Sequence, residues 1–213
     1  MHTVLLTGFE PFDQDVVNPS WEAVRQLDGM QVGSDVQIVA RRLPCAFATA
    51  GDCLVQLIDQ LRPSMVIATG LGPGRSDISI ERVAINLNDA RIPDNLGAQP
   101  IDTTVVPDGP AAYFSTLPTK AMVRAVREAG IAASVSQTAG TFVCNLVFYR
   151  LQHALVESGV RSGFIHVPNL PEQVMGVGLP SMALETVVEG LRVAVLAAWQ
   201  TTVDISEAGG QVS

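Results

Sequence analysis

Charge is scarce in this chain of 213 residues: 16% of its residues are charged, against 47% that are hydrophobic. A disordered chain needs dense charge and little hydrophobicity, so this composition excludes disorder. The balance is acidic, with 13 Lys and Arg against 21 Asp and Glu and a net charge of −8. Because there is also no basic run, we expect no nucleic-acid partner, and a small uncharged ligand fits better.

Long apolar runs are also missing. The N-terminus has no cationic segment, and the most apolar late stretch, residues 182–199, is interrupted by Glu185, Glu189 and Arg192. We therefore expect no export signal, no membrane partner and a cytoplasmic location. The three cysteines cannot all pair within the chain, and reduced thiols fit that compartment.

Several catalytic motifs are absent. The three histidines form no His-Glu-X-X-His and the three cysteines no Cys-X-X-Cys, so we expect no metal and no cofactor. There is no Gly-X-Ser-X-Gly elbow either. The Gly-rich run at 70–75 follows a predicted strand, but Arg75 stands where the last glycine of a dinucleotide motif belongs. A strand-like run follows it where a helix is required, which argues against nucleotide binding.

Short apolar runs alternate with helical patterns along the chain. Strands are predicted at 4–7, 36–40, 65–69, 132–137 and 164–167, and helical spacing occupies 47–61, 147–155 and 188–198. This alternation predicts an α/β fold, a three-layer α/β/α sandwich around a mainly parallel, mixed central sheet. We expect a single domain, residues 1–213, with a surface excursion at 86–99 and a small, polar tail after about Val203 that frays.

Cys144 is the cysteine best placed for chemistry. It follows a turn of small residues and precedes a predicted helix, where the helix dipole and unpaired N–H groups lower a thiol pKa and can hold an oxyanion. A small buried hydrophobe is the alternative. Cys53 lies within an amphipathic helix and Cys45 follows Pro44 at the end of a loop, so both are predicted to be structural.

His166 is the candidate partner for this thiol, because it ends a predicted strand and precedes a Pro-rich loop. His2 is terminal, and His153 is expected on the solvated face of its helix. If the strand before Cys144 and the strand ending at His166 are parallel and joined by the helix between them, both residues lie at one sheet edge. A satisfied core histidine remains the alternative.

An orienting acid cannot be chosen from the pattern alone. Glu81 is a candidate, because the inward phase of the predicted strand flips across Glu81 and Arg82, as a β-bulge near an active site would cause. An exposed strand glutamate is the alternative, and the pattern alone favours it.

Four blocks of this sequence resemble the pyroglutamyl peptidase I family, the pyrrolidone-carboxylate peptidases. They are Thr-Gly-Phe-Glu-Pro-Phe at 7–12 with Asn18 and Pro19; Glu-Arg-Val-Ala-Ile-Asn at 81–86 with 89–95; Thr-Ala-Gly-Thr-Phe-Val-Cys-Asn at 138–145; and Gly-Phe-Ile-His-Val-Pro at 163–168 with 170–173. The blocks keep the order of the family from about residue 7 to 173, and the cysteine and histidine motifs are long enough to be specific.

The resemblance implies a thiol peptidase that removes an N-terminal pyroglutamyl residue from peptides. Cys144, His166 and Glu81 would be nucleophile, base and orienting acid, and Arg91 would assist the Cys144 N–H at the oxyanion. The residues implied for the lactam are Phe9, Phe12, Asn18, Leu71 and Phe142. The resemblance also implies a homo-oligomer, a tetramer. Pyroglutamate carries no ammonium group, which suits an apolar slot with a few backbone hydrogen bonds.

The sequence departs from the family pattern at a few positions. Leu71 stands where members commonly have Gln, Leu146 where they often have His, and Glu10 where they often have Asp. A Gly pair of the family is replaced by Asp13 and Gln14. The Leu71 change bears on affinity only if the side chain, and not the backbone, meets the substrate. Two other functions remain open: a Cys-dependent amidohydrolase acting on another lactam or small amide, and a lactam-binding protein without turnover.

Overall fold

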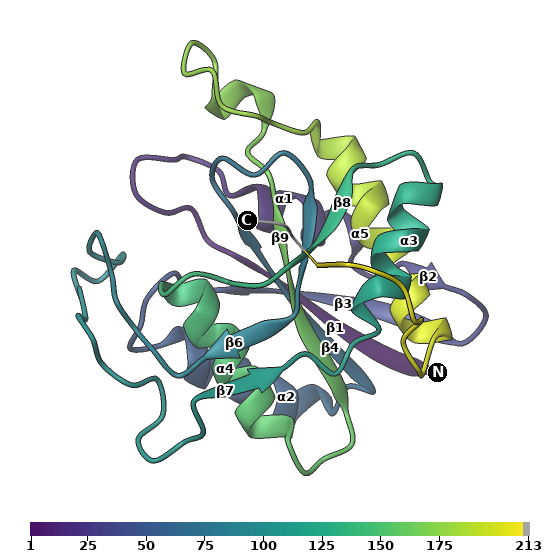
Figure 1. Ribbon diagram of the computed structural model, residues 1–213, viewed down its shortest axis with the longest axis horizontal. Coiled ribbons are helices and arrows are strands. Elements are labelled where there is room, and N and C mark those ends of the chain that lie inside the picture. Colours follow the sequence, from purple (N-terminus) through teal and green to yellow (C-terminus); the bar gives the residue numbers. More distant parts are fainter. Residues whose placement is uncertain (211–213) are drawn as a thin grey trace.

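The computed structural model describes residues 1–210 and is built around a seven-stranded sheet (Figure 1). The strand order is β2-β3-β1-β4-β9-β5-β8. The strands are β1 (His2–Phe9), β2 (Gln31–Val32), β3 (Val36–Leu43), β4 (Met65–Leu71), β5 (Ile78–Glu81), β8 (Ala133–Ser136) and β9 (Arg161–Val167). All five strands predicted from apolar runs are present: β1, β4 and β9 are buried on both faces of the sheet, whereas β3 alternates buried and partly exposed positions.

Helices cover both faces of the sheet, which confirms the predicted three layers. One apolar core joins the sheet to α1 (Pro19–Val24), α3 (Thr119–Glu128) and α5 (Leu184–Gln200). The other joins it to α2 (Ala50–Leu61) and α4 (Val143–Leu155), which lie on the opposite face in Figure 1. Two 3-10 turns, η1 (Arg25–Leu27) and η2 (Pro171–Gln173), complete the helical segments of the described chain.

The sheet is mixed, and one predicted relationship within it is wrong. Strands β3, β1, β4 and β9 are parallel, whereas β5 is antiparallel to β9 and parallel to β8. The strand before Cys144, β8, is therefore antiparallel to the strand that ends at His166, and β5 lies between them. A simple parallel crossover does not place Cys144 beside His166, so other contacts must do so.

The phase flip at Glu81 marks a change of sheet and not a bulge. Strand β5 ends at Glu81 in the central sheet, and β6 (Val83–Ile85) pairs with β7 (Ala112–Phe114) in a separate two-stranded ribbon. The ribbon packs beside α4, as Figure 1 shows. Because the chain leaves one sheet for another here, the large apolar residues shift from even-numbered to odd-numbered positions. The Glu81 side chain is completely buried, so the exposed-strand alternative for it is wrong.

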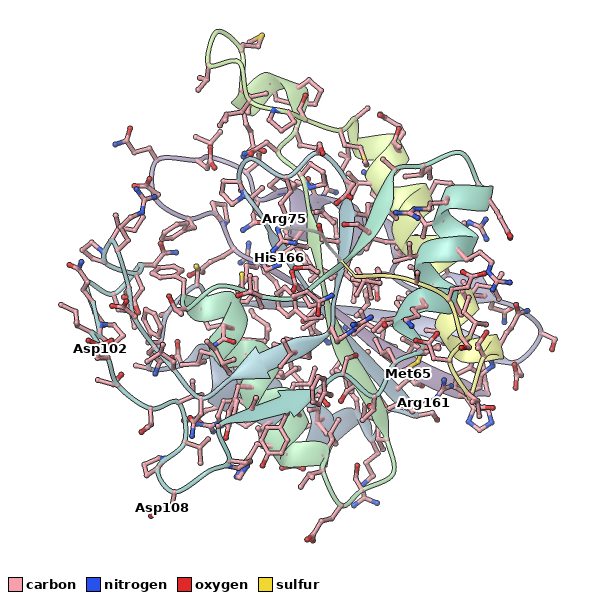
Figure 2. All side chains as sticks on the ribbon, in the orientation of Figure 1. Met65, Arg75, Asp102, Asp108, Arg161 and His166 are labelled. Atoms are coloured by element: carbon pink, nitrogen blue, oxygen red, sulfur yellow. The ribbon has the colours of Figure 1, made fainter. Side chains whose placement is uncertain are left out.

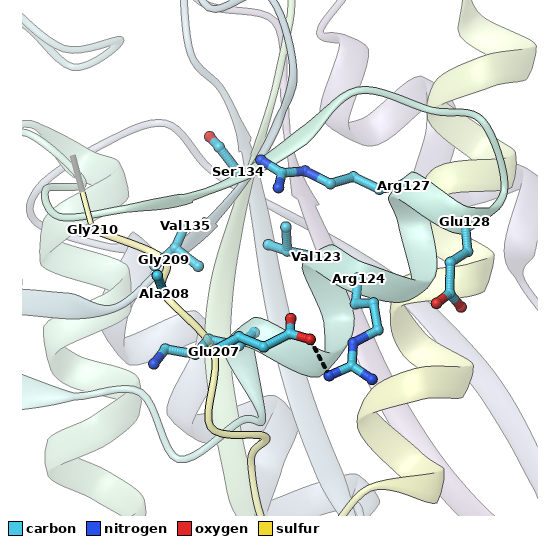
Figure 3. Close-up of a pocket in the computed structure, with 11 residues that line it drawn as sticks. Val123, Arg124, Arg127, Glu128, Ser134, Val135, Glu207, Ala208, Gly209 and Gly210 are labelled. Atoms are coloured by element: carbon cyan, nitrogen blue, oxygen red, sulfur yellow. Dashed lines mark hydrogen bonds and ion pairs between the residues drawn. The ribbon is translucent and has the colours of Figure 1, made fainter. Parts of the chain in front are cut away.

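The C-terminal tail is packed against α3 as far as the structure describes it, whereas the sequence predicts that it frays. The Asp204 carboxylate accepts hydrogen bonds from the Lys120 and Ala121 backbone N–H groups, which caps the first turn of α3. Glu207 forms an ion pair with Arg124 across a hollow of about 470 Å³ between α3, β8 and the tail (Figure 3). The predicted tail also includes residues 211–213, which lie outside the described residues.

The helices that the structure describes all lie within residues 1–210. None of the helices there combines the length and the apolar character that a bilayer span requires.

Candidate active site

One pocket of about 420 Å³ brings together residues from all four sequence blocks. It opens where β1, β4 and β9 end, and residues of the loops at 86–99 and 137–142 contribute to its lining. Its lining includes eight of the nine predicted site residues: Phe9, Phe12, Asn18, Leu71, Arg91, Phe142, Cys144 and His166. The ninth, Glu81, lies beneath the pocket floor and is reached through His166.

Glu81 and His166 form a buried pair. Oε1 of Glu81 lies 2.7 Å from Nδ1 of His166, and both side chains are almost fully inaccessible to solvent. An ionised carboxylate can only accept a hydrogen bond, so Nδ1 carries the proton and Nε2 keeps its lone pair. The arrangement is that of an imidazole whose tautomer is set by an acid, which leaves one ring nitrogen to exchange protons.

Cys144 lies beside the Glu81–His166 pair because its thiol packs over Gly70. A Cβ atom added to Gly70 would lie 2.7 Å from Cys144 Sγ, and Gly70 is the register partner of His166 across β4 and β9. The thiol therefore lies over the end of β4, one strand from the imidazole. This contact joins Cys144 to His166 although β8 and β9 are antiparallel.

The start of α4 is fixed by Asn145, which sequence reasoning did not single out. Its fully buried amide accepts a hydrogen bond from the Ile85 N–H and donates to the carbonyl oxygens of Ile85 and Leu87. The side chain thus pairs with the end of β6 as a neighbouring strand would. Because Asn145 follows Cys144 directly, this clamp also positions the thiol.

The electrostatics of Cys144 differ from the prediction. Burial raises the pKa of the thiol above its ordinary value, reinforced by Cys45 and Glu81, while Arg75 and the backbone N–H of Cys144 oppose the shift. Burial also lowers the pKa of His166, although the hydrogen bond that its Nδ1–H donates to Glu81 opposes that change. The predicted lowering by the helix terminus is therefore outweighed by desolvation. Both shifts favour a neutral thiol beside a neutral imidazole in the resting pair.

Aromatic side chains form the apolar wall of the pocket. The ring centroid of Phe142 lies 5.1 Å from that of Phe12 and 5.1 Å from that of Phe47, which contacts it edge-on. Phe9 is buried and belongs to the apolar core as well as to the pocket. Phe47 was not predicted, because its helical spacing with Leu54 and Leu57 indicates only a core position.

Asn18 acts mainly as a brace for this wall. Its side-chain oxygen accepts from the N–H and the hydroxyl of Ser20, capping α1, and its Nδ2 donates to the Glu10 carbonyl oxygen. The loop that carries Phe9 and Phe12 is thereby tied to α1. Leu71 ends β4 at the pocket, and Arg91 lies exposed at its mouth.

The sequence missed several residues that build the pocket. Cys45, predicted to be only structural, is buried and lines it, and burial raises the pKa of its thiol to about 12. Asp89 lies at the mouth, and its backbone bonds to Thr141 join the loop at 86–99 to the loop before Cys144. Glu10 connects the loop after β1 to these segments, because its carboxylate accepts hydrogen bonds from the Cys45 N–H and from the Asn95 side-chain amide.

Residues that could hold a metal do not gather here. Over residues 1–210, no group of three or more His, Cys, Asp or Glu side chains is arranged to bind an ion. What the site offers instead is a thiol, an imidazole held by a buried carboxylate, and an apolar slot beside them.

The chain is similar over its whole length to known peptidases. The family model for pyroglutamyl peptidase matches residues 2–201. The pyrrolidone-carboxylate peptidases of Pseudomonas fluorescens and Cupriavidus taiwanensis are 81% and 62% identical to it, each comparison covering 100% of both chains. The crystal structure of pyroglutamyl peptidase I from Bacillus amyloliquefaciens superposes with a TM-score of 0.95 at 43% identity, covering 98% of this chain and 100% of that one.

A second solved structure gives the same result. Pyrrolidone carboxyl peptidase from Thermococcus litoralis superposes with a TM-score of 0.94 at 38% identity, covering 98% of this chain and 100% of that one. The fold and its relatives define the class of protein as a hydrolase, a peptidase with an α/β sandwich. The chain belongs to the pyroglutamyl peptidase family.

Proposed function

We propose that this protein hydrolyses the bond after an N-terminal pyroglutamyl residue of peptides, with Cys144, His166 and Glu81 as its catalytic group. The observation that carries the proposal is the buried Glu81–His166 pair at the floor of a pocket that Cys144 also lines. Membership of the pyroglutamyl peptidase family supports the substrate class.

The chemistry follows from the protonation states of the resting pair. Nε2 of His166 takes the proton of the Cys144 thiol as the sulfur attacks the pyroglutamyl carbonyl, and the imidazolium then protonates the departing amine. A water molecule, deprotonated by His166, cleaves the thioester and releases pyroglutamate, which restores the thiol. Glu81 stabilises the imidazolium in both halves of the reaction.

The oxyanion is assigned to the start of α4. The first N–H groups of a helix have no acceptor within the helix, and no side chain caps α4 at Phe142. The backbone N–H of Cys144 therefore suits an oxyanion formed on the carbonyl that its sulfur attacks. Arg91 at the mouth of the pocket adds a positive charge on the same side.

The lactam ring is assigned to the aromatic wall. Phe9, Phe12 and Phe142 offer flat apolar surfaces, and Leu71 ends β4 beside them with its backbone N–H and carbonyl groups. An uncharged five-membered lactam matches such a slot, because its ring needs apolar contact and its amide needs only one or two hydrogen bonds.

Replacing the nucleophile tests the proposal. Cys144→Ala should remove turnover of a chromogenic pyroglutamyl amide while the protein stays folded by circular dichroism. Cys53→Ala is the matched control, since Cys53 lies on α2 outside the pocket, and it should keep wild-type turnover. Turnover that survives in Cys144→Ala would refute the mechanism. Failure of the wild type to cleave the amide would refute the substrate class.

A further inference from the structure

The Gly-rich run at 70–75, which the sequence leaves without a function, ends in an arginine that reaches the catalytic group. We propose that Arg75 is a positioning residue of this site. Its positive charge balances the negative charge of Glu81, so that Cys144 and His166 exchange protons beside a Glu81–Arg75 ion pair that has no net charge. The inference rests on the proposed roles of Cys144, His166 and Glu81.

The first observation is a shared oxygen atom. Oε1 of Glu81 lies 2.9 Å from Nη2 of Arg75 and 2.7 Å from Nδ1 of His166. Figure 2 shows Arg75 and His166 close together beside β9. The other oxygen, Oε2, is buried and has no hydrogen-bond partner among residues 1–210. A buried carboxylate without a cation is costly, and Arg75 supplies the positive charge.

The second observation is that the loop is shaped to hold this arginine. A Cβ atom on Gly72 would lie 2.6 Å from Arg75 Cδ, so the side chain folds back over the space that the glycine leaves empty. The turn is closed by the Arg75 N–H, which donates to the Gly72 carbonyl, and Gly74 adopts a positive φ of 81°. Nη2 also donates to the Thr138 carbonyl oxygen, which ties the arginine to the loop before Cys144.

The consequence is electrostatic. The charged groups that face His166 are Glu81 from β5 and Arg75 from the loop, and Cys144 faces these two and the Cys45 thiol. Glu81 raises the pKa of both Cys144 and His166, and Arg75 lowers both. Without the arginine charge, the thiolate would form only at higher pH, and the imidazole would also remain protonated to higher pH. Both limbs of the activity profile would then move in the alkaline direction.

Charge and hydrogen bonding can be separated by two substitutions. Arg75→Gln keeps a donor group but removes the charge, and Arg75→Lys keeps the charge. For each variant, two pH profiles are measured. One is that of kcat/KM for a pyroglutamyl amide, and the other is that of the rate at which iodoacetamide alkylates Cys144. We expect Arg75→Gln to shift both profiles upward by at least about one pH unit, because a unit charge has an effect of that size even from about 10 Å away at an effective dielectric constant of about 20, and Arg75 and His166 contact the same oxygen atom. Arg75→Lys should stay near the wild-type position.

A double variant tests the balance of charges directly. Glu81→Gln alone should shift the alkylation profile downward, and the pair Arg75→Gln with Glu81→Gln should lie between the two single variants. If Arg75→Gln is too unstable to assay, the double variant should recover folded protein, because it removes the unbalanced buried charge. A double variant as unstable as the single one would refute the proposal.

A structural role alone predicts a different outcome. Unchanged pH profiles in Arg75→Gln, or an equal loss at every pH that Arg75→Lys does not rescue, would overturn the inference. Arg192→Met, which breaks an ion pair with Glu189 on α5, is the matched control and should leave both profiles unchanged. Cys144→Ala is assayed in parallel: if it retains turnover, the proposed function falls, whereas an inactive Cys144→Ala with unshifted Arg75 variants refutes only the role of Arg75.

Discussion

The sulfur of Cys144 lies against the backbone of Gly70, so closely that a Cβ atom on this glycine would be 2.7 Å from it. The ring of Phe164 closes the same space, with its Cζ atom 3.0 Å from that position. A side chain at residue 70 would therefore have to displace either the thiol or the ring. Gly70 allows the Cys144 thiol to rest on β4 directly beside the strand that carries His166.

Gly70→Ala should consequently lower kcat by roughly 100-fold, because a displacement of about 1 Å misaligns a nucleophile by that much. Binding of pyroglutamate should change far less, since the aromatic wall does not include this residue. Steady-state kinetics and product affinity by calorimetry measure the two effects. Gly210→Ala is the control, because a Cβ atom there meets no neighbour, and a near-normal kcat in Gly70→Ala would show that the thiol is not held by this contact.

Glu81→Gln tests the orienting acid. The amide oxygen can still accept from Nδ1 of His166, so the protein should fold and bind pyroglutamate, but the charge that stabilises the imidazolium is lost. We expect kcat to fall by about 10²–10⁴-fold, a smaller loss than in Cys144→Ala.

Glu189→Gln is the matched control for that loss. It removes an exposed carboxylate on α5 that pairs with Arg192, and it should keep wild-type kcat. A Glu81→Gln enzyme with near-normal kcat would reduce the catalytic group to Cys144 and His166. Loss of both folding and binding would make Glu81 a purely structural residue.

Burial of His166 predicts how stability depends on pH. Its pKa is lowered in the folded state, mainly by burial, below the ordinary value of 6.5. Between the folded pKa and 6.5, the unfolded state binds more protons, so the free energy of unfolding falls as the pH falls through this window. Above 6.5 the contribution is fully present. Urea unfolding at pH 7.5 and pH 5 measures the loss.

His166→Gln removes the titrating group and should make that loss smaller than in the wild type. His153→Gln is the control, because His153 is exposed on α4 and lies outside the pocket. Equal losses in the wild type and in His166→Gln would show that burial of this imidazole does not contribute to acid sensitivity. The acid limb of kcat/KM should also have its midpoint below pH 6.5, since the base of the free enzyme must be neutral.

Much of the fold could be predicted from the sequence, because the buried strands are short runs of mainly apolar residues and the helices that cover them repeat their apolar residues at helical spacing. What the pattern could not show is where a strand changes sheet. Glu81 ends one sheet and Val83 begins another, and a parity change alone cannot distinguish this from a bulge. The antiparallel direction of β8 relative to β9 was missed for a related reason. The order and the direction of strands in a sheet both depend on contacts between residues that are far apart in the chain.

The site was predictable where residue type and place coincide, as for a cysteine before a helix and a histidine at the end of a strand. Asn145, Phe47 and Arg75 were missed, because each acts through a partner far away in the chain. Asn145 binds residue 85, and Arg75 reaches Glu81 and Thr138. Only the fold brings these partners together, so neither composition nor spacing reports them.

The composition of the pocket predicts strong selection for an uncharged N-terminus. Its walls are largely apolar, and Glu81, the buried acid beneath it, is already bonded to His166 and Arg75. Asp89, at the mouth, is exposed. The ammonium of an N-terminal Gln, Glu or Pro residue would therefore be desolvated without a partner, at a cost of about 1–3 kcal/mol or more.

We accordingly expect kcat/KM for a pyroglutamyl amide to exceed that for the matching Gln, Glu and Pro amides by about 5- to 100-fold or more, given that 1.4 kcal/mol corresponds to a factor of ten. The four amides carry the same leaving group, so the departing amine is held constant. Asp89→Asn should leave the ratios unchanged, because an exposed acid at the mouth does not meet the buried amine. Comparable rates for Gln and pyroglutamyl amides would instead indicate a broader amidohydrolase, whose pocket tolerates a charged amine and whose selectivity arises elsewhere.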